Sequence, residues 1–191
     1  MVRERADARR NRERLIEAAV AAFSGGQDTV ALEAIARDAG VGIGTLYRNF
    51  PSREALVEAV YRSELARLCD GAGDLVATLA PDRALRTWMG RYLEFVATKR
   101  GMAEALRAVI AAGAITSLQT RERLNAAIQT LLDAGAAAGS LRADVPADDV
   151  TASLVGVVLA AGAPDQREQA NRLLDLLVDG LRARDGQGAR R

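Results

Sequence analysis

Histidine is absent from this sequence of 191 residues, and cysteine occurs once, at Cys69. Without histidine the usual zinc ligand sets cannot be assembled, and a single cysteine cannot form a disulfide within the chain. A nucleophile paired with a histidine base is excluded as well. The acidic pair Asp148-Asp149 is better interpreted as a cap at the start of a helix. We therefore expect a protein without metal or cofactor, not an enzyme, in a reducing, cytoplasmic setting.

Aromatic residues are also scarce, at 4%, and only four prolines interrupt the chain, whereas 49% of the residues are apolar. This composition favours helices, and the sequence has no alternating strand pattern and no solenoid repeat. The apolar stretch 150–163 is shorter than the about 18 to 20 residues that a bilayer requires, and the N-terminus lacks the apolar segment of a signal peptide. We expect an all-α fold of about nine helices without a membrane segment.

Charge is balanced over the whole chain, with a net charge of +1, but it is uneven along it. Residues 1–14 hold six arginines and three acidic residues, which gives a local charge of +3 (six minus three). Such a basic segment suits the phosphates of duplex DNA, although a solvated tail has the same composition.

The spacing of apolar residues predicts where the helices lie, and glycine, proline and small polar residues predict their ends. Gly25-Gly26, Gly40 and Pro51 end the first three helices, while Asp28 or Thr29 and then Ser52 offer caps for the second and fourth. The predicted helices span roughly 11–23, 32–39, 43–50, 52–69, 82–98, 101–112, 116–138, 147–163 and 166–183.

The segment from Ala31 to Phe50 carries the clearest functional pattern. Two short helices joined by a tight turn need a small residue near their crossing, which Ala36 supplies, and a residue that tolerates positive φ, which Gly40 supplies. Leu46 then fills the wedge between the helices. This spacing predicts a helix-turn-helix, although an ordinary helical hairpin within a bundle has the same spacing.

With Leu46 and Phe50 turned inward, the polar residues of the third helix are distributed over its outer side, as reading a DNA major groove requires. Thr45, Arg48 and Asn49 can bond bases or phosphates, and the Tyr47 hydroxyl can reach a phosphate. A glycine-rich nucleotide loop is disfavoured, because that motif follows a strand and residues 31–39 have helical period. The candidate DNA-binding residues of this segment are Gly42, Ile43, Gly44, Thr45, Tyr47, Arg48 and Asn49.

The run from Gly40 to Leu56, GVGIGTLYRNFPSREAL, resembles the signature of the tetracycline-repressor (TetR) family. The resemblance implies a three-helix DNA-binding head, residues 43–49 as the recognition helix, Tyr47 on a phosphate, and a homodimer that reads a palindrome. The family often has histidine where Asn49 stands and lysine where Arg53 stands, and both replacements donate hydrogen bonds, so Arg53 joins the candidate DNA contacts. It often has threonine where Ala31 stands, and Asp28 or Thr29 would replace that cap.

Residues 84–88, 98–106 and 141–144 further resemble one TetR subgroup, the SbtR-like regulators. The resemblance implies an effector pocket enclosed by the fourth to seventh helices, and a mostly apolar lining would suit a hydrophobic or aromatic small molecule. Aromatics and methionines at helical spacing are equally common in a plain core. The candidate lining residues are Trp88, Met89, Tyr92, Phe95, Met102, Leu106, Ile110, Leu124 and Ile128.

The last two predicted helices carry more apolar surface than one core contact needs, which indicates a partner. Symmetric pairing with a second copy would close as a dimer and match half-sites about 34 Å apart, or a multiple of that distance. The residues expected to be exposed there are Leu154, Val155, Val158, Leu173, Leu174, Leu177 and Leu181.

The sequence thus predicts three parts: residues 1–51 form an N-terminal arm and DNA-binding domain, 52–183 an effector-binding and dimerisation domain, and 184–191 a flexible tail. We expect a homodimeric repressor that binds a double-stranded DNA operator and is released by a small hydrophobic effector. The alternative is a helical protein-interaction module without DNA binding, because the net charge is modest.

Overall fold

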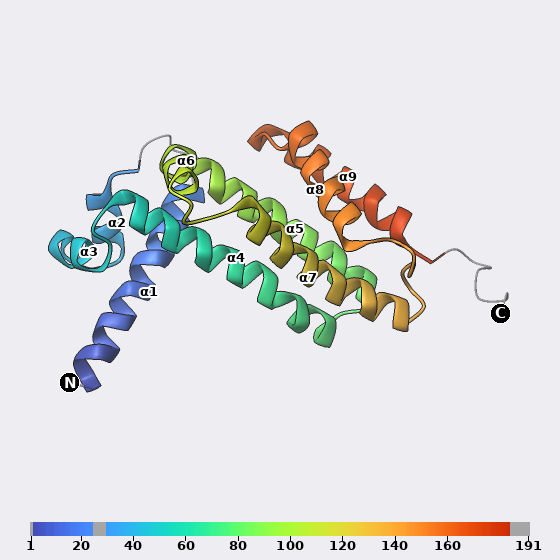
Figure 1. Ribbon diagram of the computed structural model, residues 1–191, viewed down its shortest axis with the longest axis horizontal. Coiled ribbons are helices and arrows are strands. Elements are labelled where there is room, and N and C mark those ends of the chain that lie inside the picture. The colour runs from blue at the N-terminus through green and yellow to red at the C-terminus, as the bar shows by residue number, and fades with distance from the viewer. Residues whose placement is uncertain (1, 25–29, 184–191) are drawn as a thin grey trace. The chain divides into compact units, whose positions relative to one another are not determined.

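The structure is a computed structural model that describes residues 2–24 and 30–183. Within these ranges the chain forms nine α-helices and one short 3-10 helix, and its only β pairing is an isolated bridge between Leu141 and Arg182 (Figure 1). The predicted all-α fold is confirmed. The helices are α1 Val2–Ser24, α2 Leu32–Asp38, α3 Ile43–Asn49, α4 Arg53–Thr78, α5 Pro81–Gly101, α6 Ala103–Ala111, α7 Ser117–Ala137, α8 Ala147–Ala161 and α9 Arg167–Leu181, with the 3-10 helix η1 at Pro164–Gln166.

Two helices are longer than the sequence predicts. α1 begins at Val2 rather than at Asn11, and α4 ends at Thr78 rather than near Cys69. Glycines follow Cys69, and a glycine inside a helix costs about 1 kcal/mol relative to alanine, which is why the prediction ended there. Ala72 and Leu75 are buried, so α4 continues because its apolar face still has a core to cover.

The helix caps differ between α2 and α4. α2 starts after Ala31, which makes no side-chain cap, and the predicted caps Asp28 and Thr29 lie outside the described residues, as does the tail 184–191. Ser52 caps α4 as predicted, because its hydroxyl accepts a hydrogen bond from the Ala55 N–H at 3.2 Å. Hydrogen bonds from the backbone N–H of Glu54 and from the Ser52 hydroxyl lower the pKa of the Glu54 carboxyl.

The chain packs as two compact units. The first unit comprises Met1–Leu65 and Val96–Thr116, and the second comprises Ala66–Phe95 and Ser117–Arg191, so α4 and α5 contribute to both. The boundary that the sequence predicts after residue 51 separates two functions rather than two packing units, and it stays a prediction. The core of the first unit includes Leu15, Ala19, Phe23, Ile35, Leu46, Phe50, Leu56 and Val60.

The first unit is joined tightly where α1 and α5 end. A Cβ on Gly101 would come within 1.9 Å of the Phe23 carbonyl oxygen, so this close approach requires glycine. The hydroxyls of Ser24 and Thr98 form a hydrogen bond of 2.8 Å nearby. The end of α1 is therefore fixed against the end of α5 by backbone packing and by a hydrogen bond.

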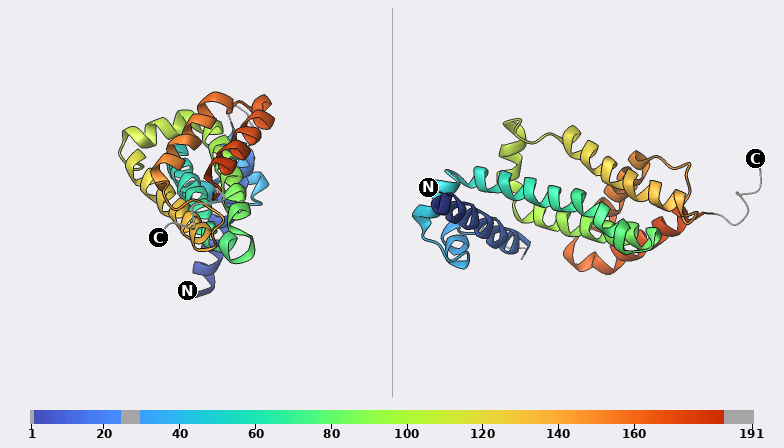
Figure 2. Two further views of the ribbon diagram at one scale, coloured as in Figure 1. Left: turned by 90° about the vertical axis from the view of Figure 1, so that its right-hand side faces the viewer. Right: turned by 90° about the horizontal axis from the view of Figure 1, so that it is seen from below.

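In the second unit α8 packs against both α7 and α9, as Figures 1 and 2 show. The Asp148 carboxylate, in the first turn of α8, accepts bonds of 2.6 and 2.8 Å from Arg121 and one of 2.9 Å from Asn125, both on α7. These hydrogen bonds lower the pKa of Asp148 to about 2. The pair Asp148-Asp149 lies in the first turn of α8, but it does not cap the helix as predicted, because the N-cap is Pro146, no side-chain cap bond is made, and the Asp148 carboxylate bonds α7 instead.

None of the helices in the described part of the chain is long and apolar enough to span a membrane. α8, which contains most of the apolar stretch singled out in the sequence, has 15 residues.

Candidate nucleic-acid interface

The turn between α2 and α3 depends on Gly40, which has a φ of +66°. The Gly40 N–H donates to the Arg37 carbonyl and the Val41 N–H to the Ala36 carbonyl, each at 2.9 Å. This pair of bonds defines a Schellman motif, which needs a left-handed residue at the glycine position. Gly40 therefore ends α2 and sets the direction in which α3 starts, as the sequence predicts.

α3 has only seven residues and depends on packing for its stability, because so short a helix is unstable alone in water. Leu46 and Phe50 are 0% and 1% exposed, and Ala36 is buried on α2, as predicted for the residue near the crossing. α1, α2 and α3 pack against one another and form a three-helix head. Two inward side chains thus hold α3 against the head.

The opposite side of α3 is open to solvent. Ile43 is 38% exposed and Tyr47 is 47% exposed, one turn apart on the same face. Gly42, Gly44 and Arg48 are exposed as well, while Thr45 and Asn49 are half-buried. The structure therefore places these predicted DNA-binding residues along one short helix and its N-cap Gly42, with the exposed side chains of Ile43 and Tyr47 one turn apart.

The polar side chains of α3 are already ordered by hydrogen bonds along the helix. Arg48 donates to the Gly44 carbonyl and to the Thr45 hydroxyl, both at 3.1 Å, and the Asn49 amide donates to the Thr45 carbonyl at 2.8 Å. A guanidinium carries five N–H donors, so Arg48 keeps donors for a base or a phosphate. These bonds lower the entropy that each side chain would lose on binding.

Arg53, which entered the prediction as a DNA contact, also has a partner inside the head. Its Nη1 donates to the Val30 carbonyl at 2.6 Å, and its guanidinium lies 5.7 Å from the centre of the Phe23 ring. Val30 stands just before α2, so Arg53 fixes the start of a helix that lacks a side-chain cap. A phosphate contact by Arg53 stays a prediction.

Arg12 was not among the predicted site residues, because in the sequence it is one of six arginines in a basic N-terminal segment. From α1, Arg12 Nη1 donates to the Asn49 carbonyl at 3.1 Å, and the guanidinium lies 4.3 Å from the centre of the Phe50 ring. Helical spacing could have pointed to this contact, because Arg12 lies three and seven residues before Leu15 and Ala19, which are both fully buried. An exposed basic residue, one turn before the buried residues of α1, therefore contacts the end of α3.

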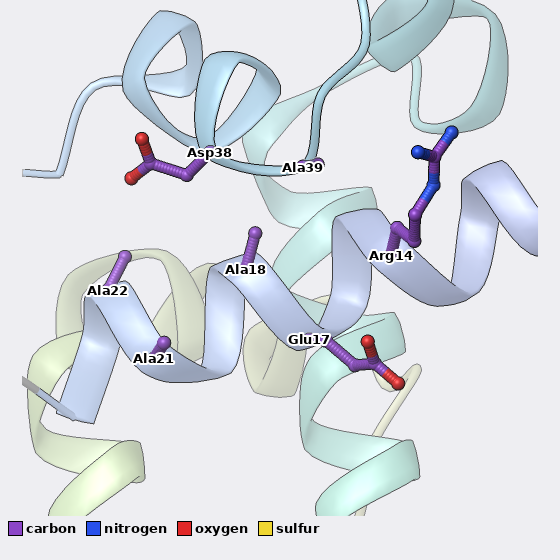
Figure 3. Close-up of a pocket in the computed structure, with 7 residues that line it drawn as sticks. All are labelled: Arg14, Glu17, Ala18, Ala21, Ala22, Asp38 and Ala39. Atoms are coloured by element: carbon purple, nitrogen blue, oxygen red, sulfur yellow. The ribbon is translucent and has the colours of Figure 1, made fainter.

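An open groove of about 560 Å³ lies between α1 and α2 (Figure 3). Alanines from both helices line it, together with the charged residues Arg14, Glu17 and Asp38. It contains none of the predicted DNA-binding residues, and its lining is not the apolar and aromatic one predicted for an effector.

The residues predicted to line an effector pocket are buried, with the exception of Ile110, which is 43% exposed on α6 and does not fit the prediction. Trp88 donates from its indole N–H to the Leu68 carbonyl at 2.8 Å and stacks on Tyr92 with ring centres 6.3 Å apart. Burial of this kind is compatible with a pocket wall and with a plain core. Trp88, Met89, Tyr92, Phe95, Leu124 and Ile128 belong to the second unit, and Met102 and Leu106 to the first.

The predicted dimer surface on α8 and α9 needs a correction. Leu154, Leu174 and Leu181 are only 1%, 0% and 4% exposed, so their predicted exposure is wrong. One stripe of each amphipathic helix covers the protein's own core, and these three residues lie in it. The large apolar side chains that do reach the surface are Val155 at 40%, Leu159 at 82% and Leu176 at 67% exposed, while Val158, Leu173 and Leu177 are half-buried.

In the described part of the chain, histidine, cysteine and acidic residues form no group that could hold a metal ion. Cys69 is a half-buried free thiol, and burial raises its pKa to about 11.

A glycine turn, two inward anchors and an outward polar strip on a short helix define a helix-turn-helix DNA-binding protein. The model of bacterial regulatory proteins of the tetR family matches residues 15–60, and the model of the transcriptional regulator SbtR-like C-terminal domain matches residues 80–183. The chain belongs to the TetR family of transcriptional regulators, which are not enzymes. Both resemblances seen in the sequence are confirmed.

Solved structures agree with this assignment. A TetR transcriptional regulator from Streptomyces coelicolor is 51% identical with a TM-score of 0.82, and the match covers 90% of this chain and 98% of that one. A TetR transcription regulatory protein from Mycobacterium vanbaalenii is 34% identical with a TM-score of 0.72, over 94% of this chain and 99% of that one.

Among curated proteins, the HTH-type transcriptional repressor KstR from Mycobacterium tuberculosis is 36% identical over 86 residues. That match takes in 44% of this chain and 39% of the repressor, so it spans less than half of either protein.

Proposed function

We propose that the protein is a homodimeric repressor that reads a palindromic operator with α3 and leaves it when a small hydrophobic effector binds. The observation that carries the DNA-binding part is the outward strip of α3, where Ile43, Tyr47 and Arg48 are exposed while Leu46 and Phe50 anchor the helix. The relative KstR is named a transcriptional repressor, which supports repression rather than activation of transcription by this protein.

Each exposed group of α3 suits a particular contact. Thr45 and Arg48 offer a hydroxyl and a guanidinium that can read base edges, and the Tyr47 hydroxyl suits a phosphate. Gly42 and Gly44 carry no side chain, and a Cβ at either would meet no atom within 4 Å, so this surface leaves room for the DNA backbone. Arg53 would add a phosphate contact through the donors that Val30 does not occupy.

The DNA-reading role of α3 is tested with Arg48→Ala. A duplex selected by the wild-type protein from a random-sequence library serves as the operator. Loss of a base contact is worth about 1–3 kcal/mol, so the dissociation constant for this duplex should rise about tenfold. Arg107→Ala is the matched control, because Arg107 is also exposed but lies on α6 of the same unit. Equal affinities for the wild type and Arg48→Ala would contradict the proposal.

The effector part of the proposal rests on the buried aromatic group around Trp88, with Tyr92 and Phe95 on the same helix. Trp88 is the only tryptophan of the chain, so its fluorescence reports on this one place. Apolar and aromatic compounds are screened for saturable quenching of Trp88. A compound that quenches should also weaken operator binding, and saturable binding that leaves operator affinity unchanged would contradict release by that effector.

The dimer part rests on Val155, Leu159 and Leu176, which leave apolar surface uncovered on α8 and α9. Pairing of these two helices with their copies would form an isologous interface between two identical chains, which suits a palindrome. The half-buried residues Val158, Leu173 and Leu177 would lie at its margin.

A further inference from the structure

We infer that Arg12 is a positioning residue, which fixes the C-terminal end of α3 so that α3 can discriminate between DNA sequences, and that it does not itself carry the DNA contact. The inference rests on the proposed function, in which α3 reads the operator. It concerns a residue on α1 that no sequence pattern of the helix-turn-helix singled out.

The contact occurs where α3 needs a partner. The last carbonyls of any helix lack N–H donors within it, and the end of a helix carries partial negative charge. Arg12 Nη1 donates to the Asn49 carbonyl, the last residue of α3, at 3.1 Å. The next residue, Phe50, has an extended backbone with φ −138°, so the chain leaves the helix at this point. A cation from another helix therefore completes the end of α3.

The guanidinium also lies over an aromatic ring. It lies 4.3 Å from the centre of the Phe50 ring, and Phe50 is only 1% exposed, so the ring that supports the guanidinium is itself fixed in the core. Arg12 is itself exposed, and it lies one turn before Leu15 on the side of α1 where Leu15 and Ala19 are buried. Arg12 therefore bridges the core-facing side of α1 and the far end of α3.

Both ends of α3 are then attached to the head by different means. The first end follows the Gly40 turn, with the Val41 N–H bonded to the Ala36 carbonyl. The second end depends on Phe50 and on the bond from Arg12. Base readout requires side chains placed to within about 0.5 Å, whereas attraction to phosphates tolerates larger displacements. Without Arg12, α3 should lose sequence discrimination before it loses general affinity for DNA.

The matched control is Arg9, on the same helix. Its side chain is 82% exposed and pairs with Glu13 of α1 at 2.8 Å, so it links no second element. Arg9→Ala removes the same charge as Arg12→Ala without touching α3. The two variants therefore separate loss of charge from loss of positioning.

The test measures dissociation constants of the full chain for two duplexes, the selected operator and a scrambled duplex of the same composition, at several salt concentrations. For Arg12→Ala the ratio of the two constants is expected to fall about tenfold, as for a misplaced base contact. The constant for the scrambled duplex and the dependence of binding on salt should stay as in the wild type. Arg9→Ala should keep the wild-type ratio.

Arg12→Lys is the second variant, because lysine keeps the charge but lacks the planar, forked guanidinium that lies over Phe50. In this variant the ratio of the two dissociation constants should stay as low as in Arg12→Ala. A melting curve by circular dichroism checks that the variant is folded. Restoration by lysine would overturn the inference. A second result would also overturn it: Arg12→Ala binds both duplexes more weakly, and its plot of log affinity against log salt concentration has a slope smaller by about 0.9. That change is expected when one phosphate contact is lost. If the wild type does not distinguish the two duplexes, the proposed function fails instead.

Discussion

The arginines of the DNA-binding head differ in what their guanidinium groups contact. Arg12 and Arg53 lie over Phe50 and Phe23, and each donates to a carbonyl on another segment of the head. Arg48 instead bonds only within its own helix. Position on a helical face, rather than the number of basic residues, therefore decides which contacts each guanidinium makes within the head.

Contacts of this kind mark the limit of prediction from sequence at the residue scale. The inward side of α3 could be predicted, because Leu46 and Phe50 lie one helical turn apart, shortly after the recognisable Gly40. The partners of Arg12 and Arg53 lie 37 and 23 positions away along the chain. Such pairs depend on how whole helices pack, which local periodicity does not contain.

Cys69 is expected to be chemically quiet in the folded protein. Burial raises its pKa to about 11, and only the thiolate reacts, so about one molecule in several thousand is reactive at pH 7.5. Modification by 5,5′-dithiobis(2-nitrobenzoate) should be slow in buffer and fast in denaturant, and it should accelerate as the pH rises towards 11. Equal rates in buffer and in denaturant would contradict this.

At the scale of helices, the predicted number and order were correct because each helix has a local beginning and end. The length of α4 was wrong, since Gly71 and Gly73 look like an ending while Ala72 and Leu75 have a core to cover. Leu154 and Leu181 were misplaced for a related reason. Periodicity shows that a face is apolar, but a second copy and the protein's own core are equally good partners for it.

The close approach of α1 and α5 leaves no room for a side chain at Gly101. In Gly101→Ala the new Cβ would meet the Phe23 carbonyl, a backbone atom that cannot rotate away, so urea denaturation should show a loss of about 3 kcal/mol. Gly90→Ala is the control on the same helix, because its Cβ would lie 3.7 Å from the flexible side chain of Arg86. That variant should be as stable as the wild type or slightly more so. Equal stability of the two variants would contradict the packing described.

At the scale of the whole molecule, the proposed reading of a palindrome requires two copies of the head, and the exposed apolar side chains of α8 and α9 are the surface that we propose for pairing. Leu159 is the most exposed large apolar residue among those described, at 82%, and Leu118 on α7 is comparably exposed at 66%. The two residues therefore form a matched pair, one inside the proposed interface and one outside it.

Leu159→Glu should convert a dimer of 20.3 kDa chains into monomers, because two copies would bury like charges at one symmetric contact. Analytical ultracentrifugation measures the mass, and operator affinity should fall at least about tenfold with it. Leu118→Glu should remain dimeric. Dimers in both variants would place the interface elsewhere.

The measurement that tests the central claim most directly is a salt titration of wild-type protein and of Tyr47→Ala on the selected operator. If α3 and the flanking residues hold several phosphates, wild-type affinity should fall about a thousandfold between 50 and 200 mM salt, and Tyr47→Ala should bind more weakly at every concentration. Wild-type binding that is indifferent to salt, or no duplex selected at all, would contradict the account and favour a helical interaction module instead.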